Sequence, residues 1–344
     1  MKKKLPKIIV VCGPTGSGKT ALAVSLCKKF NGEIVNADSR QVYREMDIGT
    51  AKNLDVNPKS QIPNPKQTQN SKSQTIQGVP VHLVNIVDPN ERYNVGQFKK
   101  DAEVAIADII SRGKVPFVVG GTGLYIDALV ENFQLPEENN KNISVGARSP
   151  RPDLGGGTPP LQELIKDLNK FDSEALSIVD LKNRRRVERA IEYCLTTGKK
   201  FSESRKKGER KYTVLKLSPA VSLDREKLYE KINKRVEEMI EEGLEKEVKT
   251  LAEKYGWDSE AMTGIGYREW REYFSVGTRH ALSLQNVIDQ IKQDSRNYAK
   301  RQITWFKRPA RNALACEADG DKEINWVCPN SGGAEKLVKE FLTI

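Results

Sequence analysis

The chain has 344 residues, of which 38% are hydrophobic and 30% charged, a composition typical of a soluble protein with one large or two modest domains. No run approaches the roughly 18 apolar residues of a membrane span, and the apolar stretch after the basic start is too short for a signal peptide, so we expect a cytoplasmic protein that contacts no membrane. Five scattered cysteines without a Cys-x-x-Cys pair and only two histidines argue against a zinc site, whereas a net charge of +11 favours a polyanionic partner.

A glycine-rich segment near the N-terminus carries the most specific signal in the chain. It reads Gly13, Pro14, Thr15, Gly16, Ser17, Gly18, Lys19 and Thr20. The segment follows an apolar run at 8–12 that predicts a strand, and it opens a helical pattern, which is the setting that a P-loop requires. Backbone N–H groups of such a turn can wrap a di- or triphosphate, Lys19 adds a positive charge, and the Thr20 hydroxyl can reach a Mg²⁺ ion. We predict that a ligand with a pyrophosphate group binds here.

Four further β-branched runs alternate with helical patterns and complete the predicted sheet. They cover residues 33–37, 81–87, 115–119 and 213–217. Strands that alternate with helices after a P-loop predict the α/β class, with a P-loop NTPase-like parallel sheet flanked by helices. Beyond these strands the apolar residues recur at a helical period, and a last helix is expected at about 283–307.

Two segments of low complexity interrupt this pattern, at 57–78 and 137–160. Both are rich in polar residues, proline or glycine, so burial cannot repay the entropy of ordering them and we expect disorder. The predicted organisation is a P-loop core at 1–135, a helical insertion at 136–182, the remainder of the core at 183–222, a helical C-terminal region at 223–310 and a C-terminal tail at 311–344.

Two features at the carboxyl ends of predicted strands are candidates for the site: Asp38 and a second glycine-rich turn. Asp38 follows the second strand, where parallel sheets place their functional groups, and its carboxylate could accept a proton or hold Mg²⁺. Capping a helix is the open alternative for Asp38. Thr122 lies in a second glycine-rich turn at 120–123, which predicts either backbone N–H groups beside the P-loop or a plain strand-to-helix turn.

Outside the P-loop, two clusters of basic residues and one single arginine are candidates for binding phosphates. Arg185, Arg186 and Arg189 form a stripe on one predicted helix, which suits either phosphates or a solvated helix face. Residues 298–308 interleave aromatic and basic side chains, a pattern that stacks nucleic-acid bases or, alternatively, anchors a core. Arg235 lies in the helix after the last strand, from where it could reach bound phosphates, although an exposed surface position is the common alternative.

Six motifs in this order resemble the tRNA dimethylallyltransferase family. They are the P-loop, Asp38 to Tyr43 with Met46 to Lys52, Val119 to Tyr125, Arg185 to Glu192, Gly264 to Tyr267 and Tyr298 to Gln302. The family transfers the dimethylallyl group of dimethylallyl diphosphate to the exocyclic N6 amine of the adenosine immediately 3′ of the tRNA anticodon, with Mg²⁺ present and diphosphate released. The resemblance therefore implies two partners, dimethylallyl diphosphate and the anticodon arm of tRNA, and we expect the protein to be a monomer.

The resemblance also implies roles for individual residues. Asp38 matches the catalytic aspartate that takes the proton of the amine. Thr15 matches a position at the leaving group, which Lys19 and Arg235 would neutralise. The positions that match tRNA contacts are Asp38, Ser39, Arg40, Gln41, Thr122, Arg185, Arg186, Val187, Glu188 and Arg189.

Some assignments stay open at this point. Thr20 would hold the Mg²⁺ ion, but Arg235, Lys231 and Arg225 are all candidates for the basic ligand of the diphosphate. The segment at 139–160 lacks the first helix of the insertion with which the family grips tRNA, and the last two cysteines do not reproduce the zinc finger of eukaryotic relatives, which indicates a bacterial-type enzyme. A small-molecule P-loop kinase or ATPase, an adenylate isopentenyltransferase and a non-catalytic tRNA-binding module remain the alternative functions.

Overall fold

A computed structural model describes most of the chain. The described residues are 5–55, 74–135, 159–205, 208–219, 224–275, 283–307, 324–328 and 332–343. They form two compact units, one made of Met1–Val130 with Lys211–Ile344 and the other of Glu131–Arg210. None of the described helices is long and apolar enough to cross a membrane.

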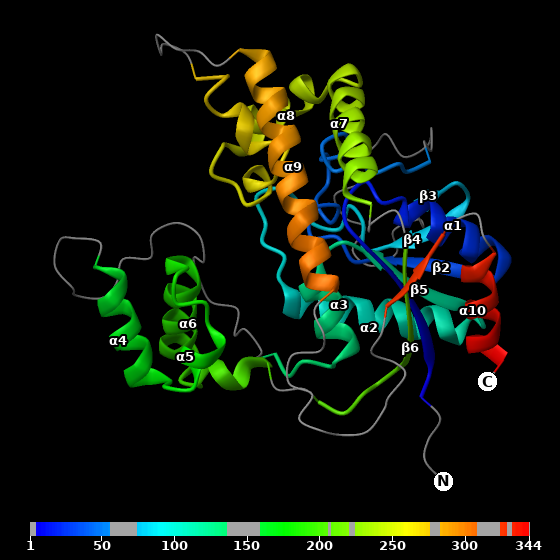
Figure 1. Ribbon diagram of the computed structural model, residues 1–344, viewed down its shortest axis with the longest axis horizontal. Coiled ribbons are helices and arrows are strands. Elements are labelled where there is room, and N and C mark those ends of the chain that lie inside the picture. The colour runs from blue at the N-terminus through cyan, green and yellow to red at the C-terminus, as the bar shows by residue number, and fades with distance from the viewer. Residues whose placement is uncertain are drawn as a thin grey trace. The chain divides into compact units, whose positions relative to one another are not determined.

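The first unit is built on a sheet with the strand order β3-β4-β2-β5-β1-β6-β7 (Figure 1). The strands are β1 (Lys7–Cys12), β2 (Gly32–Asn36), β3 (Gln74–Ile76), β4 (Val79–His82), β5 (Val115–Gly120), β6 (Thr213–Pro219) and β7 (Asn325–Val327). The pairs described are parallel except for β3 with β4, which is antiparallel. The mostly parallel sheet with flanking helices confirms the α/β, P-loop NTPase-like fold.

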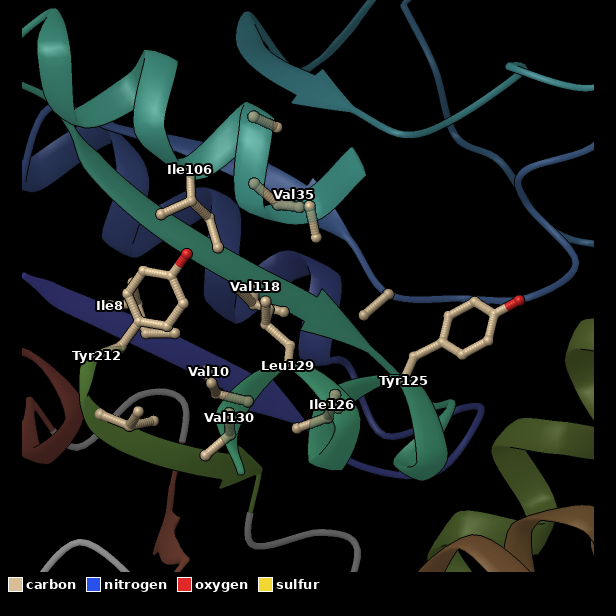
Figure 2. Close-up of a cluster of buried hydrophobic side chains, with 14 of the residues drawn as sticks. Ile8, Val10, Val35, Ile106, Val118, Tyr125, Ile126, Leu129, Val130 and Tyr212 are labelled. Carbon is tan, nitrogen blue, oxygen red and sulfur yellow. The ribbon is translucent and has the colours of Figure 1, made fainter. Parts of the chain in front are cut away.

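Alternate residues of β1 fill the cores on the two faces of the sheet. Ile8 and Val10 face a cluster with side chains of α2 and α3, whereas Ile9 and Val11 face a cluster with side chains of α1 and α10. Figure 2 shows the first of these clusters, with Val118 of β5 beside Val10. The helices are α1 (Lys19–Lys29), α2 (Val95–Ser111), α3 (Gly123–Val130) and α10 (Gly333–Thr343). Because both faces are covered, β1 from Ile8 to Cys12 and β5 are apolar, as the sequence indicated.

Three longer helices follow β6 and form a third core. They are α7 (Arg225–Glu241), α8 (Leu244–Tyr255) and α9 (Leu284–Phe306). The helical pattern at 224–255 is divided by Gly243, whose φ of +100° favours glycine and ends the first helix there. Ser283 caps α9 by accepting the backbone N–H of Asn286, so the predicted helix at about 283–307 is confirmed.

The second unit consists of short helices around a small core of its own. They are α4 (Leu161–Phe171), α5 (Ala175–Ile178), α6 (Arg184–Thr197) and the 3₁₀ helix η1 (Phe201–Arg205). Val187 and Ile191 of α6 pack with Leu164 and Leu168 of α4. The predicted return to the P-loop core at 183 is therefore misplaced, because the apolar face of α6 is buried within this unit and the first unit resumes at Lys211.

Two predicted irregular segments contain regular structure. Within the predicted disorder at 57–78, β3 pairs with β4 through a tight turn, whose Gln77 and Gly78 N–H groups both bind the Asp55 carboxylate. The predicted tail at 311–344 contains β7 and α10. The remainder of both low-complexity segments, 57–73 and 137–158, lies outside the described residues, and the predicted strand at 81–87 ends at His82.

Glu33 is a buried carboxylate at the amino end of β2, and it contacts two cationic side chains and a histidine. Arg112 binds it through both terminal nitrogens, Lys114 donates to Oε1 at 2.6 Å, and His82 lies 2.8 Å from Oε2. The hydrogen bonds from Arg112, followed by those from Lys114 and His82, hold the pKa of Glu33 well below its usual range. The charged carboxylate therefore stabilises the folded state at neutral pH.

Replacing Glu33 should destabilise the fold measurably. We expect Glu33→Gln to lower the free energy of unfolding at pH 7 by about 2 kcal/mol, the scale of hydrogen bonds to charged groups. Since the folded-state pKa is depressed, this contribution is present above the unfolded pKa of about 4.3 and is lost as the pH falls below it. Urea unfolding at pH 7 and at acidic pH measures both effects. Glu335→Gln, which breaks an exposed pair with Lys29, should cost less than about 1 kcal/mol, and equal losses would contradict this account.

Candidate active site

A cavity of about 280 Å³ lies at the carboxyl ends of β1 and β2 in the first unit. Its walls come from the glycine-rich loop after β1, the segment after β2, helices α7 and α9, and the turns at 263–268. Of the residues singled out from the sequence, it brings together Thr15, Lys19, Asp38, Ser39, Arg40 and Arg235. Polar groups therefore converge where parallel sheets bind their ligands.

The loop between β1 and α1 has the conformation that its glycines predict. Gly16 and Gly18 have φ values of +76° and +83°, which other residues rarely adopt, and α1 begins at Lys19. The Lys19 side chain is partly buried beside the loop, where its amine donates to the Pro14 carbonyl at 3.4 Å. Burial lowers the pKa of Lys19 to about 8, while Asp38 raises it and Arg235 lowers it further. Lys19 is therefore a cation that an anion in the cavity would stabilise.

Arg235 is a second partly buried cation beside the same loop. Its Nη1 donates to the Thr15 hydroxyl at 3.0 Å and its Nη2 to the Thr50 carbonyl at 3.5 Å. Burial lowers the pKa of Arg235, and its Nε has no hydrogen-bond partner among the described residues. A partly buried guanidinium whose buried Nε is an unused donor, next to a partly buried ammonium, is suited to binding an anion. Lys231 and Arg225 are not among the cavity-lining residues, so the geometry favours Arg235 of the three candidates.

Asp38 faces the cavity and does not cap a regular helix. Its Oδ1 accepts the backbone N–H of Arg40 at 2.9 Å, a local turn that fixes the side chain. One such bond uses only part of the acceptor capacity of a carboxylate. Asp38 raises the pKa of both Lys19 and Arg235, so the acid and the two cations form one electrostatic group.

The neighbours of Asp38 are tied to other parts of the first unit. The Ser39 N–H donates to the Thr122 hydroxyl at 3.0 Å, which links the segment after β2 to the second glycine-rich turn. Arg40 binds the Glu260 carbonyl and the Thr263 hydroxyl. The Gln41 amide donates to the carbonyl of Thr50 instead of facing the cavity. Of residues 38–41, only the first three therefore line the cavity.

The arginine stripe lies on α6 in the second unit. Arg185, Arg186 and Arg189 are exposed, and Arg186 lies 3.7 Å from the carboxylate of Asp180. Val187 is fully buried in the core of that unit, so its side chain is out of reach of a ligand. Glu188 pairs with the preceding Arg184 at 2.7 Å. The exposed stripe is confirmed as a basic helix face, and its contact with RNA stays a prediction.

Gln302 on α9 ends the motif Tyr298 to Gln302, but sequence reasoning assigned it no individual role in the site. Its Oε1 accepts the Thr15 N–H at 2.9 Å, and its Nε2 donates to the Gly121 carbonyl at 2.9 Å. Gln302 thus fastens the two glycine-rich turns to each other. One turn further along α9, Trp305 donates to Asp127 at 2.9 Å and packs on Gly123, so its ring is a structural anchor. The helical spacing of these two residues was the available signal.

Removing the amide of Gln302 should weaken the hold of the glycine-rich loop on an anion. Gln302→Leu leaves the Thr15 N–H and the Gly121 carbonyl buried without this partner, at about 1–3 kcal/mol for each group. We expect the affinity for magnesium pyrophosphate, measured by calorimetry, to fall about ten-fold or more. Gln285→Leu, at an exposed position near the start of the same helix, should leave the affinity unchanged. An unchanged affinity in Gln302→Leu would contradict the role given to this amide.

The chain is similar to one family of proteins over most of its length. A family model described as IPP transferase matches residues 41–309, and one described as isopentenyl transferase matches residues 6–60. A tRNA dimethylallyltransferase of Bacillus cytotoxicus is 37% identical over 323 residues, which cover 93% of each chain. One of Anoxybacillus flavithermus is 38% identical over 301 residues, 88% of this chain and 87% of the relative.

Solved structures of similar proteins share the fold. The full-length tRNA isopentenylpyrophosphate transferase of Bacillus halodurans superimposes with a TM-score of 0.61 at 31% identity, covering 98% of this chain and 95% of that one. A eukaryotic dimethylallyltransferase, solved in snapshots of its action on tRNA, gives a TM-score of 0.67 at 28% identity, covering 98% of this chain and 80% of that one.

Proposed function

The chain belongs to the IPP transferase family, and we propose that it transfers the dimethylallyl group of dimethylallyl diphosphate to the N6 amine of the adenosine 3′ of the tRNA anticodon. Diphosphate is the other product. The observation that carries this proposal is a single cavity in which two partly buried cations, Lys19 and Arg235, lie beside the Asp38 carboxylate. Such a site offers cations that can stabilise a leaving anion and, beside them, a carboxylate that can accept a proton.

The two cations and the glycine-rich loop support the departure of diphosphate. Breaking the bond between the allylic carbon and the diphosphate oxygen leaves negative charge on the oxygen and cationic character on the carbon. Lys19, Arg235 and the loop N–H groups would stabilise that negative charge, and because they are already fixed they need little reorganisation. The Thr15 hydroxyl, held by Arg235, lies at the same place.

Apolar side chains of α7 and α9 form a wall against which the dimethylallyl tail could pack. Ile232, Val236 and Met239 line the cavity from α7, and Ile291 lines it from α9. These residues are buried, with at most 7% of their surface exposed. An apolar wall next to an anion site matches an allylic diphosphate better than a nucleoside triphosphate, whose base and ribose are polar.

Asp38 is suited to act as the general base. The exocyclic amine of adenine is a weak nucleophile because its lone pair is delocalised into the ring. As the nitrogen–carbon bond forms and the carbon–oxygen bond breaks, the nitrogen gains positive charge and must lose a proton. The Asp38 carboxylate would take that proton, while its link to Arg40 keeps it in place.

The residues present fit a Mg²⁺ ion that is held mainly by the diphosphate. Within the described part of the chain there is no group of three acidic, histidine or cysteine side chains that could hold a metal by themselves. Thr20 follows Lys19 in the first turn of α1, and its hydroxyl would add one ligand to phosphate oxygens and water, which is a usual donor set for Mg²⁺. When bound, the ion neutralises charge on the leaving group.

Recognition of tRNA would use groups from both units. Ser39, Arg40 and Arg301 line the cavity near Asp38, where an extruded base would enter. Arg185, Arg186 and Arg189 present an exposed basic face on α6, which suits the phosphates of a stem. That the protein acts as a monomer in the cytoplasm stays part of this proposal.

A transfer assay with matched omissions tests the proposal. The protein is incubated with unmodified tRNA, Mg²⁺ and dimethylallyl diphosphate labelled in its carbon chain, without ATP, and in parallel with AMP replacing tRNA. Label in tRNA and none in AMP is the expected result. Preferential labelling of AMP would indicate an adenylate isopentenyltransferase, and ATP turnover without label transfer would indicate a kinase or ATPase; either would contradict the proposal.

A further inference from the structure

The segment 46–52 forms part of the cavity wall although it is neither helix nor strand. Gly49 and Thr50 line the cavity, and the residues around them form turns. A wall of this kind has no ladder of hydrogen bonds to fix it, so its position depends on side chains that bind its backbone. Such a side chain is Glu247 of α8, which is not itself among the cavity-lining residues.

Glu247 binds the backbone of this segment through both carboxylate oxygens. Oε2 accepts the N–H groups of Asp47 at 3.0 Å and Ile48 at 2.8 Å. Oε1 accepts the N–H of Gly49 at 3.1 Å and the hydroxyl of Tyr267 at 2.7 Å. A carboxylate offers about four acceptor sites, so these four donors use its full capacity. Hydrogen bonds to an ionised acceptor are also the stronger kind.

The next residue connects this segment to the candidate catalytic groups. The Thr50 carbonyl accepts two hydrogen bonds. One comes from the side-chain amide of Gln41, which lies three residues after Asp38, at 2.9 Å, and the other from Nη2 of Arg235 at 3.5 Å. The ring of Tyr267 packs against Gly49 so closely that a Cβ there would come within 2.5 Å of it. The Thr50 carbonyl, one of the two hydrogen-bond partners of Arg235, therefore directly follows the residue that Glu247 and Tyr267 hold.

We propose that Glu247 is a positioning residue, which holds residues 47–49 so that the Thr50 carbonyl aims the Arg235 guanidinium at the diphosphate. This inference rests on the proposed function for the identity of the anion. The proposed transfer does not itself require it, because Glu247 touches neither the cavity nor the reacting atoms. Its effect reaches the anion through the chain of contacts from Gly49 to Thr50 to Arg235.

Glu247→Gln tests the inference with almost no change of shape. The substitution replaces one of the two acceptor oxygens with an NH₂ group, which is a donor. This NH₂ group then faces N–H or O–H groups, so at least one of them loses its acceptor. We expect the affinity for magnesium pyrophosphate to fall about ten-fold, the scale of one lost hydrogen bond to a charged group. Tyr267→Phe removes one donor and keeps the ring on Gly49, so a smaller loss of about three-fold is expected. Glu253→Gln, an exposed position on the same helix, should have no effect.

A double variant separates positioning from general loosening of the fold. In the Arg235→Ala background, Glu247→Gln should cause no further loss of pyrophosphate affinity, because its effect acts through Arg235. An equal loss in both backgrounds, or an unchanged affinity in Glu247→Gln, would overturn the inference. If Glu247→Gln does not fold, Tyr267→Phe gives the same comparison. Because the probe is pyrophosphate, the result does not depend on which group the enzyme transfers.

Discussion

Asp38→Asn should abolish most of the transfer while leaving diphosphate binding intact. The amide keeps the size of the side chain and can still accept the Arg40 N–H, but it cannot take a proton from the amine at neutral pH. We expect the rate of dimethylallyl transfer to tRNA to fall about 10²- to 10⁴-fold, the usual contribution of a general base. Single-turnover assays with excess enzyme measure this step directly.

Binding measurements distinguish a lost base from a damaged site. Asp38 contributes negative charge next to Lys19 and Arg235, so its neutralisation should leave the affinity for magnesium pyrophosphate equal or tighter. Asp258→Asn removes a carboxylate that is 89% exposed and pairs with Arg271, and it should behave like the wild type in both assays. A variant of Asp38 that transfers at the normal rate would remove this residue from the mechanism.

Arg235→Ala should cause the second large loss, and it should affect both binding and chemistry. The substitution removes a partly buried guanidinium that contacts Thr15 and the Thr50 carbonyl. The positive charge of Arg235 would stabilise the departing diphosphate more than the bound substrate. We therefore expect kcat/KM to fall about 10²- to 10³-fold, with kcat lowered and KM raised. Steady-state kinetics with varied dimethylallyl diphosphate checks both parameters.

Variants at the same position and at the adjacent position of α7 sharpen this test. Arg235→Lys keeps the charge but not the planar fork of donors, so it should recover only part of the lost activity. Lys234→Ala removes a charge that is 77% exposed, at the adjacent position of the same helix, and should change kcat/KM less than about two-fold, as expected for exposed charges. Equal losses in Arg235→Ala and Lys234→Ala would indicate long-range electrostatics instead of a specific ligand.

The parts of the fold that the sequence predicts are those in which local pattern and tertiary environment agree. The run that forms β1, the glycines that need positive φ and the helix that starts at Lys19 all carry their own signals. The motif resemblance to the tRNA dimethylallyltransferase family is confirmed by relatives at 37% and 38% identity. Asp38 could be placed at the carboxyl end of β2 from strand prediction alone.

The features that escaped prediction depend on contacts between residues far apart in the chain. β3 and β7 are three residues long and exist because β4 and β6 offer them an edge to pair with. The Thr15 N–H meets Gln302 across 287 residues, and Glu247 meets Asp47 across 200. From the sequence alone, a glutamine or glutamate on a helix is predicted to be exposed to solvent, because most such residues are. The prediction places α6 in the P-loop core, whereas α6 belongs to the second unit. Its sequence pattern shows that one face is buried but not which unit buries that face.

The fate of the two halves of dimethylallyl diphosphate is the most direct test of the account. A substrate labelled in the carbon chain and, separately, in the diphosphate is incubated with the protein, Mg²⁺ and unmodified tRNA, and the tRNA is then digested to nucleosides. We predict carbon label on the N6 atom of one adenosine next to the anticodon and an equal amount of phosphate label released as free pyrophosphate. Phosphate label attached to RNA, or pyrophosphate released without carbon label on adenosine, would contradict the conclusion that this P-loop holds a departing diphosphate.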